Sequence, residues 1–159
     1  STIQAMANNN VVGGYQGHVL GDTFDGSAVD SIMLNGFNSL NMTVNFGNAN
    51  PIVLNSLQFQ TSKGWTYQQS SNLTNVSSAI TVNTSTNTQG YTATVGNSVN
   101  TSDILRLQGK FYGPTANSTG GAFTGALTGS SGGVSSQRNV QGVFKAGGIL
   151  INGEMQGGH

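Results

Sequence analysis

Few side chains in this 159-residue chain could act as acids, bases, nucleophiles or soft metal ligands. There are two histidines, His18 and His159, and no cysteine. A Ser–His–Asp arrangement would have to combine His18 and Asp22 with one of many serines, and serine is too abundant here to mark a nucleophile. The absence of cysteine excludes disulfides, thiolate zinc sites and iron–sulfur clusters. We therefore predict that the chain is not an enzyme and needs no metal.

The acidic residues also fail to form a recognisable site. Glycoside hydrolysis needs a pair of carboxyl groups, and four of the five candidates lie where predicted turns or strand starts already explain them. The segment Asp22-x-x-Asp25-Gly26 lacks the spacing of a calcium loop, and Gly109-Lys110 lacks the glycine and the following hydroxyl of a phosphate loop. The five acidic residues are Asp22, Asp25, Asp30, Asp103 and Glu154.

Charge excludes further classes of partner. Charged residues make up 6% of the chain and the formal net charge is zero, whereas nucleic-acid binding requires a basic surface that neutralises phosphates. Arg106 and Lys110 would share one face of a strand, and we interpret them as parts of a solvated outer wall rather than a partner site. No apolar run approaches the roughly 20 residues that span a bilayer. We predict no nucleic acid and no transmembrane segment.

The elements that must position any site read as β-strands. From Leu40 to Phe46 apolar and polar residues alternate strictly, which is typical of a half-buried strand. A first strand is expected over residues 11–20, with Tyr15 and His18 on opposite faces. Many such segments recur at a spacing of 8–12 residues, the last at 149–155, and no segment has a clear helical period. This pattern indicates an antiparallel sandwich or barrel.

Four polar segments are expected to be loops, and residues 1–10, which have no clear period, are expected to be an N-terminal extension. Trp65 and Tyr67 alternate with polar neighbours, so we interpret them as packing residues rather than a binding platform. The predicted loops are 21–31, 70–78, 84–90 and 129–138; the last is rich in serine and glycine.

One hairpin carries the most information. Residues 107–123 read Leu-Gln-Gly-Lys-Phe-Tyr-Gly-Pro-Thr-Ala-Asn-Ser-Thr-Gly-Gly-Ala-Phe. Gly113-Pro114 should end a strand, because proline cannot donate to a ladder and restricts the residue before it. Gly120-Gly121 should permit positive φ before a new strand begins near Phe123.

This hairpin resembles the signature of the β-barrel domain in the transferrin-binding protein B family. Residues 15–18 and 40–47 resemble the opening strands of that barrel, and residues 141–146 resemble its closing strand. The resemblance implies an all-β fold, an eight-stranded antiparallel up-and-down β-barrel. The expected organisation is a short extension over residues 1–10 and a barrel domain over residues 11–159, with any outer-membrane anchor upstream of Ser1.

By that resemblance the chain is a non-enzymatic binding module, secreted or exposed on a bacterial surface, in iron or haem acquisition. The partner would be a host iron protein, engaged by loops or outer faces, or haem. Some relatives bind haem, and a neutral imidazole is the commonest axial ligand of haem iron. His18 is therefore the candidate haem ligand, with Tyr15 close in sequence. The alternative for His18 is a hydrogen-bonded or solvated side chain on a polar face.

Two other functions stay open at this stage. The chain could bind a host immune factor such as a complement regulator, as a similar barrel does. It could instead be an adhesive or structural module of a larger surface protein, which its low charge and its Asn, Thr and Gly content would suit.

Overall fold

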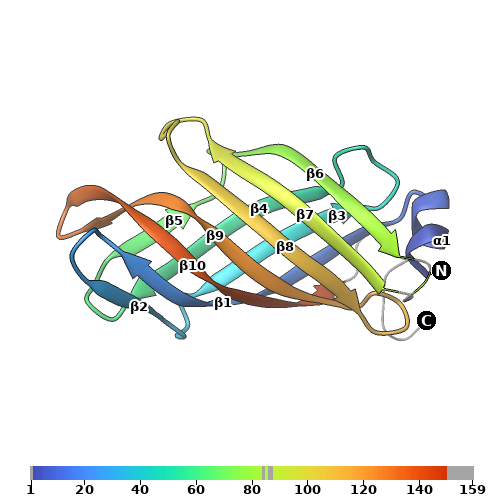
Figure 1. Cartoon of the computed structure of the whole chain (residues 1–159), viewed down its shortest axis with the longest axis horizontal. Coiled ribbons are helices and arrows are strands. Elements are labelled where there is room, and N and C mark those ends of the chain that lie inside the picture. The colour runs from blue at the N-terminus through green and yellow to red at the C-terminus, as the bar shows by residue number, and fades with distance from the viewer. Residues whose placement is uncertain (1, 84, 86–87, 150–159) are drawn as a thin grey trace.

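A computed structural model describes residues 2–83, 85 and 88–149 of the chain. One short helix precedes a single antiparallel sheet of ten strands (Figure 1). The elements are α1 (Thr2–Asn8), β1 (Val12–Phe24), β2 (Val29–Met33), β3 (Ser39–Asn45), β4 (Ile52–Thr61), β5 (Thr66–Gln69), β6 (Leu73–Asn83), β7 (Thr88–Asn97), β8 (Ile104–Tyr112), β9 (Ser118–Ser131) and β10 (Val134–Ile149). The predicted last strand at 149–155 lies outside the described residues except for Ile149.

Strand alternation builds the core. In β3 and β8 every second side chain is buried, because successive residues of a strand point to opposite faces of the sheet. The buried set includes Trp65 and Tyr67, which confirms that these aromatic residues pack inside. Phe59 lies 5.9 Å from Trp65 and 5.5 Å from Tyr67 between ring centroids, so the three rings form one cluster.

The sheet closes on itself. β1 pairs with both β3 and β10, β3 with β4, β4 with β5, β5 with β9, and β9 with β10, so these six strands form a continuous ring. From β9 the sheet continues through β8 and β7 to β6. The all-β, antiparallel prediction is confirmed, but the count of eight strands is not, because the described residues form ten. Of the two shortest strands, β2 begins inside the segment 21–31 that was predicted to be a loop, whereas β5 lies where Trp65 and Tyr67 were seen to alternate with polar neighbours.

β6 approaches β4 without pairing with it. The backbone N–H of Ile52 donates to Ser78 Oγ over 2.9 Å, and that of Leu54 donates to Asn75 Oδ1 over 2.8 Å. Asn50 Nδ2 donates to the Asn75 carbonyl over 3.0 Å. We call this side-chain junction between β4 and β6 the seam. The loop predicted over 70–78 is therefore wrong, because β6 begins at Leu73. Its inward Asn75 and Ser78 are polar because they bond to the backbone of β4.

The predicted loop over 129–138 is also wrong. β9 and β10 form one long hairpin that turns at Gly132-Gly133, where φ is +56° and +81°. A two-residue turn with both φ angles positive matches the twist of the flanking strands, and Gly-Gly suits it. Gly121, expected in a turn, lies inside β9 and its φ is not positive. It must be glycine because a Cβ there would lie 2.0 Å from the Gln108 carbonyl oxygen on β8.

The N-terminal segment is more ordered than an unstructured extension. α1 buries Ile3 and Met6 in the core, and Val11 follows it into the first strand. Figure 1 shows α1 at one end of the sheet, where β6 also ends. Among the described residues no helix has both the length and the apolar character needed to cross a membrane.

Candidate functional site

His18 lies on the outer face of β1, opposite Lys145 of β10. Its Nδ1 is 2.5 Å from the Asn38 carbonyl oxygen. A carbonyl oxygen only accepts hydrogen bonds, so Nδ1 must carry a proton in this contact. In the neutral ring this leaves the lone pair on Nε2, the atom that could coordinate a metal or accept a hydrogen bond. Most of the residues that line the hollow beside it are polar, among them Gln16, Ser39 and Asn41.

Tyr15 is on the opposite face of the same strand. Its side chain is fully buried and its hydroxyl donates to the Ala116 carbonyl oxygen over 2.6 Å. Burial, followed by the nearby Tyr91, raises the pKa of the Tyr15 phenol, so the hydroxyl stays protonated. The two predicted site residues are therefore not brought together, and Tyr15 holds the turn after β8 against the core.

The outer wall beside His18 carries exposed apolar side chains that sequence reasoning missed. Leu20 lies directly across from Val143 of β10, and Phe24 directly across from Val29 of β2. Since Asp22 pairs with Ser31, Leu20 and Met33 occupy neighbouring positions on the same face. We call these residues the outer apolar patch: Leu20, Phe24, Val29, Met33, Leu34 and Val143, each at least 41% exposed.

The patch was missed because residues 21–31 were predicted to be a loop. In the structure β1 continues to Phe24 and only residues 25–28 connect it to β2. The sequence held no clear signal, because the outward positions Leu20, Asp22 and Phe24 mix apolar and charged residues and the inward positions are Gly21 and Thr23. Asp25 organises the short connection, since its Oδ1 accepts the backbone N–H groups of Ser27 and Ala28. These backbone hydrogen bonds, that of Ala28 first, lower the pKa of the Asp25 carboxyl.

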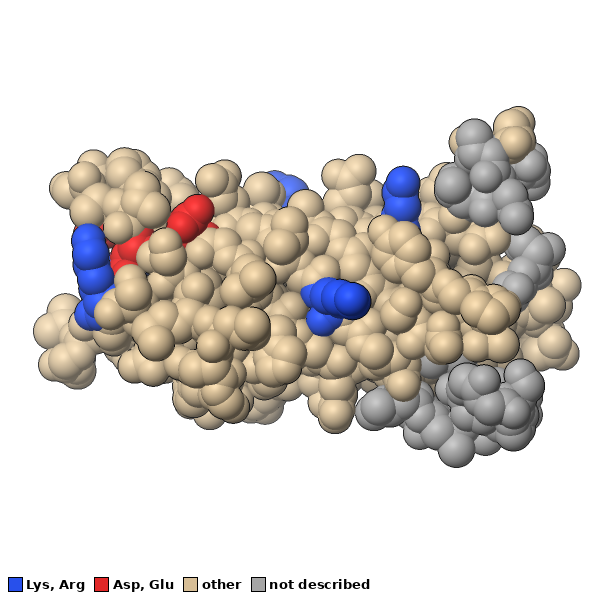
Figure 2. Space-filling model, turned by 90° about the horizontal axis from the view of Figure 1, so that it is seen from below, with Lys and Arg blue, Asp and Glu red and all other residues tan. Residues whose placement is uncertain are grey.

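One charged side chain interrupts the patch: Asp22 lies between Leu20 and Phe24 on the same face of β1 and accepts a hydrogen bond from Ser31. Figure 2 shows this side of the molecule as a largely uncharged surface with isolated basic groups and a few acidic atoms near one end. Across the described ranges, no three residues among histidine and the acidic types gather closely enough to hold a metal ion. The geometry suits contact with a partner's uncharged surface rather than electrostatic attraction.

One pair of charges lies in a buried polar cluster near the same end, and the sequence did not reveal it. Arg138 donates from one NH group to Asp30 Oδ2 over 2.8 Å and to Thr23 Oγ1 over 3.0 Å. Asp30 is 3% exposed and also accepts hydrogen bonds from Thr61, Ser62 and the backbone N–H of Lys63. The Arg138 guanidinium lies 5.0 Å from the centre of the Trp65 ring. We call this group the Asp30–Arg138 cluster.

The cluster is structural. Burial acts to raise the pKa of Asp30, but the hydrogen bonds from Thr61, Arg138, Lys63 and Ser62 outweigh it and hold the pKa below its ordinary value. The carboxylate is therefore charged and fully partnered at neutral pH. It ties together β1, β2, the turn after β4, and β10, and so fixes the wall that carries the outer apolar patch.

Three of the four predicted loops, 21–31, 70–78 and 129–138, are mainly strand and keep only short connections. The fourth, 84–90, lies partly outside the described residues, with β7 beginning at Thr88. Binding through long variable loops therefore has little support in these segments, and the outer strand faces become the larger surface.

A comparison with protein families places this fold. The model of a family described as the C-lobe and N-lobe beta barrels of Tf-binding protein B matches residues 6–147. The match runs from α1 almost to the end of β10 and includes the predicted signature hairpin. None of the curated proteins compared with the chain matches it.

Proposed function

Because the chain belongs to the family of Tf-binding protein B beta barrels, we propose that it is a non-enzymatic binding module of a bacterial surface that captures a host iron protein. The family match carries this proposal. The scaffold would be the eight-stranded barrel expected from the resemblance, with β2 as an additional short strand at one end and β5 linking β4 to β9. A rigid sheet suits such a role, because specificity can reside in side chains of its outer face.

The contact we propose is the outer apolar patch. Exposed apolar side chains that adjoin one another on a soluble protein mark interaction surfaces, whereas isolated ones do not. Leu20 and Val143 stand at its centre, flanked by Met33. The small number of charges nearby argues that apolar contact, rather than long-range attraction, supplies the affinity.

The test is a direct binding measurement with transferrin, in iron-loaded and iron-free forms, on immobilised protein. We expect saturable binding that falls at least tenfold in Val143→Lys and is unchanged in Val99→Lys, because both valines are exposed but Val99 lies outside the patch. If neither the iron-loaded nor the iron-free form binds, transferrin is rejected as the partner. A pull-down from whole serum would then separate an immune-factor partner, such as a complement regulator, from a purely structural module.

A second candidate ligand is haem, favoured by one observation. The contact between His18 Nδ1–H and the Asn38 carbonyl orients the ring and leaves Nε2 as the coordinating atom, an arrangement common among metal-binding histidines. Leu40 is the one large apolar residue among those that line the adjoining hollow, so coordination would have to supply most of the affinity.

A haem titration followed by visible absorbance tests this ligand. A saturable Soret band at a 1:1 ratio that is lost in His18→Ala, and kept in Gln16→Ala on the same face, would support it. A band that is indifferent to His18, or no band, would reject His18 as the ligand.

A further inference from the structure

β6 is the terminal strand of the sheet, and within the part of the chain that the structure describes half of it faces no strand other than β7. Among the described residues β7 is the only strand that pairs with it. The seam to β4 involves Asn75 and Ser78, which leaves the segment 79–82 beyond it. In an antiparallel strand alternate residues direct their N–H and C=O groups to opposite sides. Segment 79–82 therefore directs backbone donors and acceptors away from β7.

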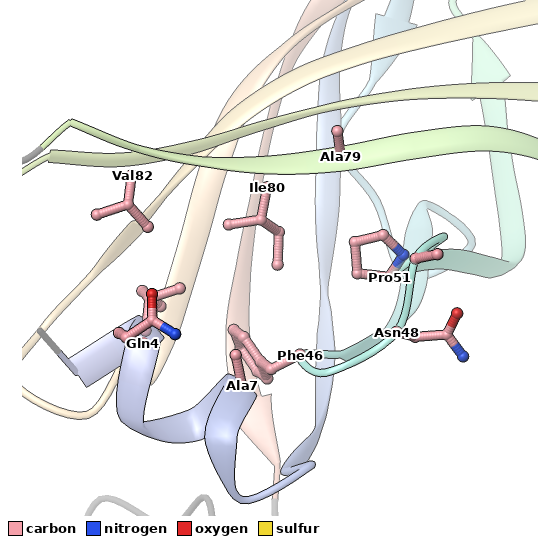
Figure 3. Close-up of a pocket in the computed structure, with 10 residues that line it drawn as sticks. Gln4, Ala7, Phe46, Asn48, Pro51, Ala79, Ile80 and Val82 are labelled. Carbon is pink, nitrogen blue, oxygen red and sulfur yellow. The ribbon is translucent and has the colours of Figure 1, made fainter.

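Beneath this edge lies an uncharged cleft of about 250 Å³, lined by apolar residues together with Gln4 and Asn48. Figure 3 shows Ile80 and Val82 pointing from β6 toward α1 and Phe46, with Pro51 at one side. None of the ten residues that line the cleft is charged: Ile3, Gln4, Ala7, Phe46, Asn48, Ala49, Pro51, Ala79, Ile80 and Val82. The volume is below the roughly 300–1,000 Å³ of pockets for drug-sized ligands, which suits a few side chains rather than a whole small molecule.

The edge also lacks the devices that normally prevent strand pairing. Proteins protect such edges with lysine, proline, inward charges or bulges. β6 contains no charged residue and no proline, and its register shift lies between Asn75 and Ser77, at the seam rather than along segment 79–82. Its inward side chains are only half-buried, whereas Leu105 and Leu107 of β8 are nearly inaccessible.

We propose that segment 79–82 of β6 and the cleft beneath it form a docking site for an uncharged, extended peptide segment of a partner protein. The peptide adds a strand to β6, so that main-chain hydrogen bonds supply affinity. Its alternate side chains enter the cleft beside Ile80, Val82 and Phe46 and supply specificity. The occupant must be uncharged where it faces the cleft, because no lining residue could pair with a buried charge. This surface is separate from the outer apolar patch and does not depend on the proposed function.

The test begins with selection from a phage-displayed library of seven-residue linear peptides against the 159-residue protein. We expect enriched sequences with apolar residues at alternate positions and no charge at those positions. Their affinity should fall at least tenfold in Ile80→Lys, which places a charge in the cleft. It should be unchanged in the matched control Thr81→Lys, whose side chain is exposed on the other face of the same strand. No enrichment, or equal loss in both variants, would overturn the proposal.

Two further measurements distinguish strand addition from simple apolar contact, and they do not depend on a variant that must fold. N-methylation of the selected peptide at alternate residues should abolish binding for one set of positions and spare the other, because only one set donates to β6. Amide hydrogen exchange should slow at alternate residues of segment 79–82 when the peptide binds. Binding that ignores the methylation pattern would overturn strand addition. A concentration-dependent dimer, lost in Ile80→Lys, would overturn the proposal by assigning the edge to a second copy of this chain.

Discussion

The two flanks of the sheet are joined in different ways. β9 and β10 pair continuously from Ser131 and Val134 to Ser118 and Gly147, and the Asp30–Arg138 cluster fastens the wall beyond them. β4 and β6 instead meet only at the seam, where side chains replace a backbone ladder. A continuous ladder leaves no backbone group for a partner, whereas the seam leaves half of β6 available. Stability and accessibility are therefore placed on different sides of one sheet.

The largest expected effect is at the flank formed by β9, β10 and the Asp30–Arg138 cluster, which we call the closed side. Arg138→Met leaves Asp30 as a buried carboxylate without its cation, and removing one partner of a buried ion pair costs about 3–5 kcal/mol. Urea unfolding should therefore show a large fall in the free energy of unfolding. The control Arg106→Met, at an exposed position, should stay within about 0.5 kcal/mol of the wild type. Equal effects of the two changes would remove the Asp30–Arg138 cluster from the account of stability.

The closed side should also resist added volume. In Gly121→Ala the new methyl group would lie 2.0 Å from the Gln108 carbonyl oxygen, so β8 and β9 must move apart, at a cost of about 1–3 kcal/mol. Gly36→Ala is the control, because nothing lies within 4 Å of a Cβ at that position. Thermal unfolding should place Gly121→Ala well below the wild type and Gly36→Ala close to it. A tolerated Gly121→Ala would mean that these strands are not closely apposed.

The seam should contribute less. Asn75→Ala removes the acceptor for the backbone N–H of Leu54 and should lower the free energy of unfolding by about 1–2 kcal/mol. Because the seam and the Asp30–Arg138 cluster share no residue, combining Asn75→Ala with Arg138→Met should give additive losses. Urea unfolding of the single and double variants measures this. Strong non-additivity would show that the two flanks are coupled.

The smallest expected effect is the pH dependence of the closed side. The pKa of Asp30 is lower in the folded chain than its ordinary value, so the folded state favours the charged form. This contribution is fully present above the unfolded pKa of about 3.9 and is lost as pH falls through the folded value. The difference in unfolding free energy between wild type and Asp30→Asn should therefore shrink below about pH 4. A difference that is constant from pH 7 to pH 3 would contradict the assignment.

Sequence reasoning succeeded where apolar side chains alternate along a strand. It failed where polar side chains, rather than a backbone ladder, connect two strands. Leu40–Phe46 and Trp65 were predicted as buried or half-buried, because alternation by itself identifies the inward face. The first part of β6, up to Ser78, was predicted to be a loop because its inward Asn75 and Ser78 are polar. They are polar because they accept hydrogen bonds from the backbone of β4, more than twenty residues earlier in the chain. No local pattern records such a bond.

The candidate site divides in the same way. Alternation placed His18 and Tyr15 on opposite faces of the first strand, and the structure confirms this placement, although it does not test a role for His18 in binding haem. The outer apolar patch needed the register between β1, β2 and β10, which brings Leu20, Val143 and Met33 together from distant parts of the chain.

The sequence by itself determined the antiparallel all-β character, the family and the near absence of charge, because these depend on local periodicity, a contiguous motif and composition. Only the tertiary structure decided which strands meet through ladders and which through side chains. It alone paired Arg138 with Asp30 and left segment 79–82 at an edge that no other described strand covers. The physical reason is that strand pairing and ion pairing depend on distances between residues that are far apart in sequence.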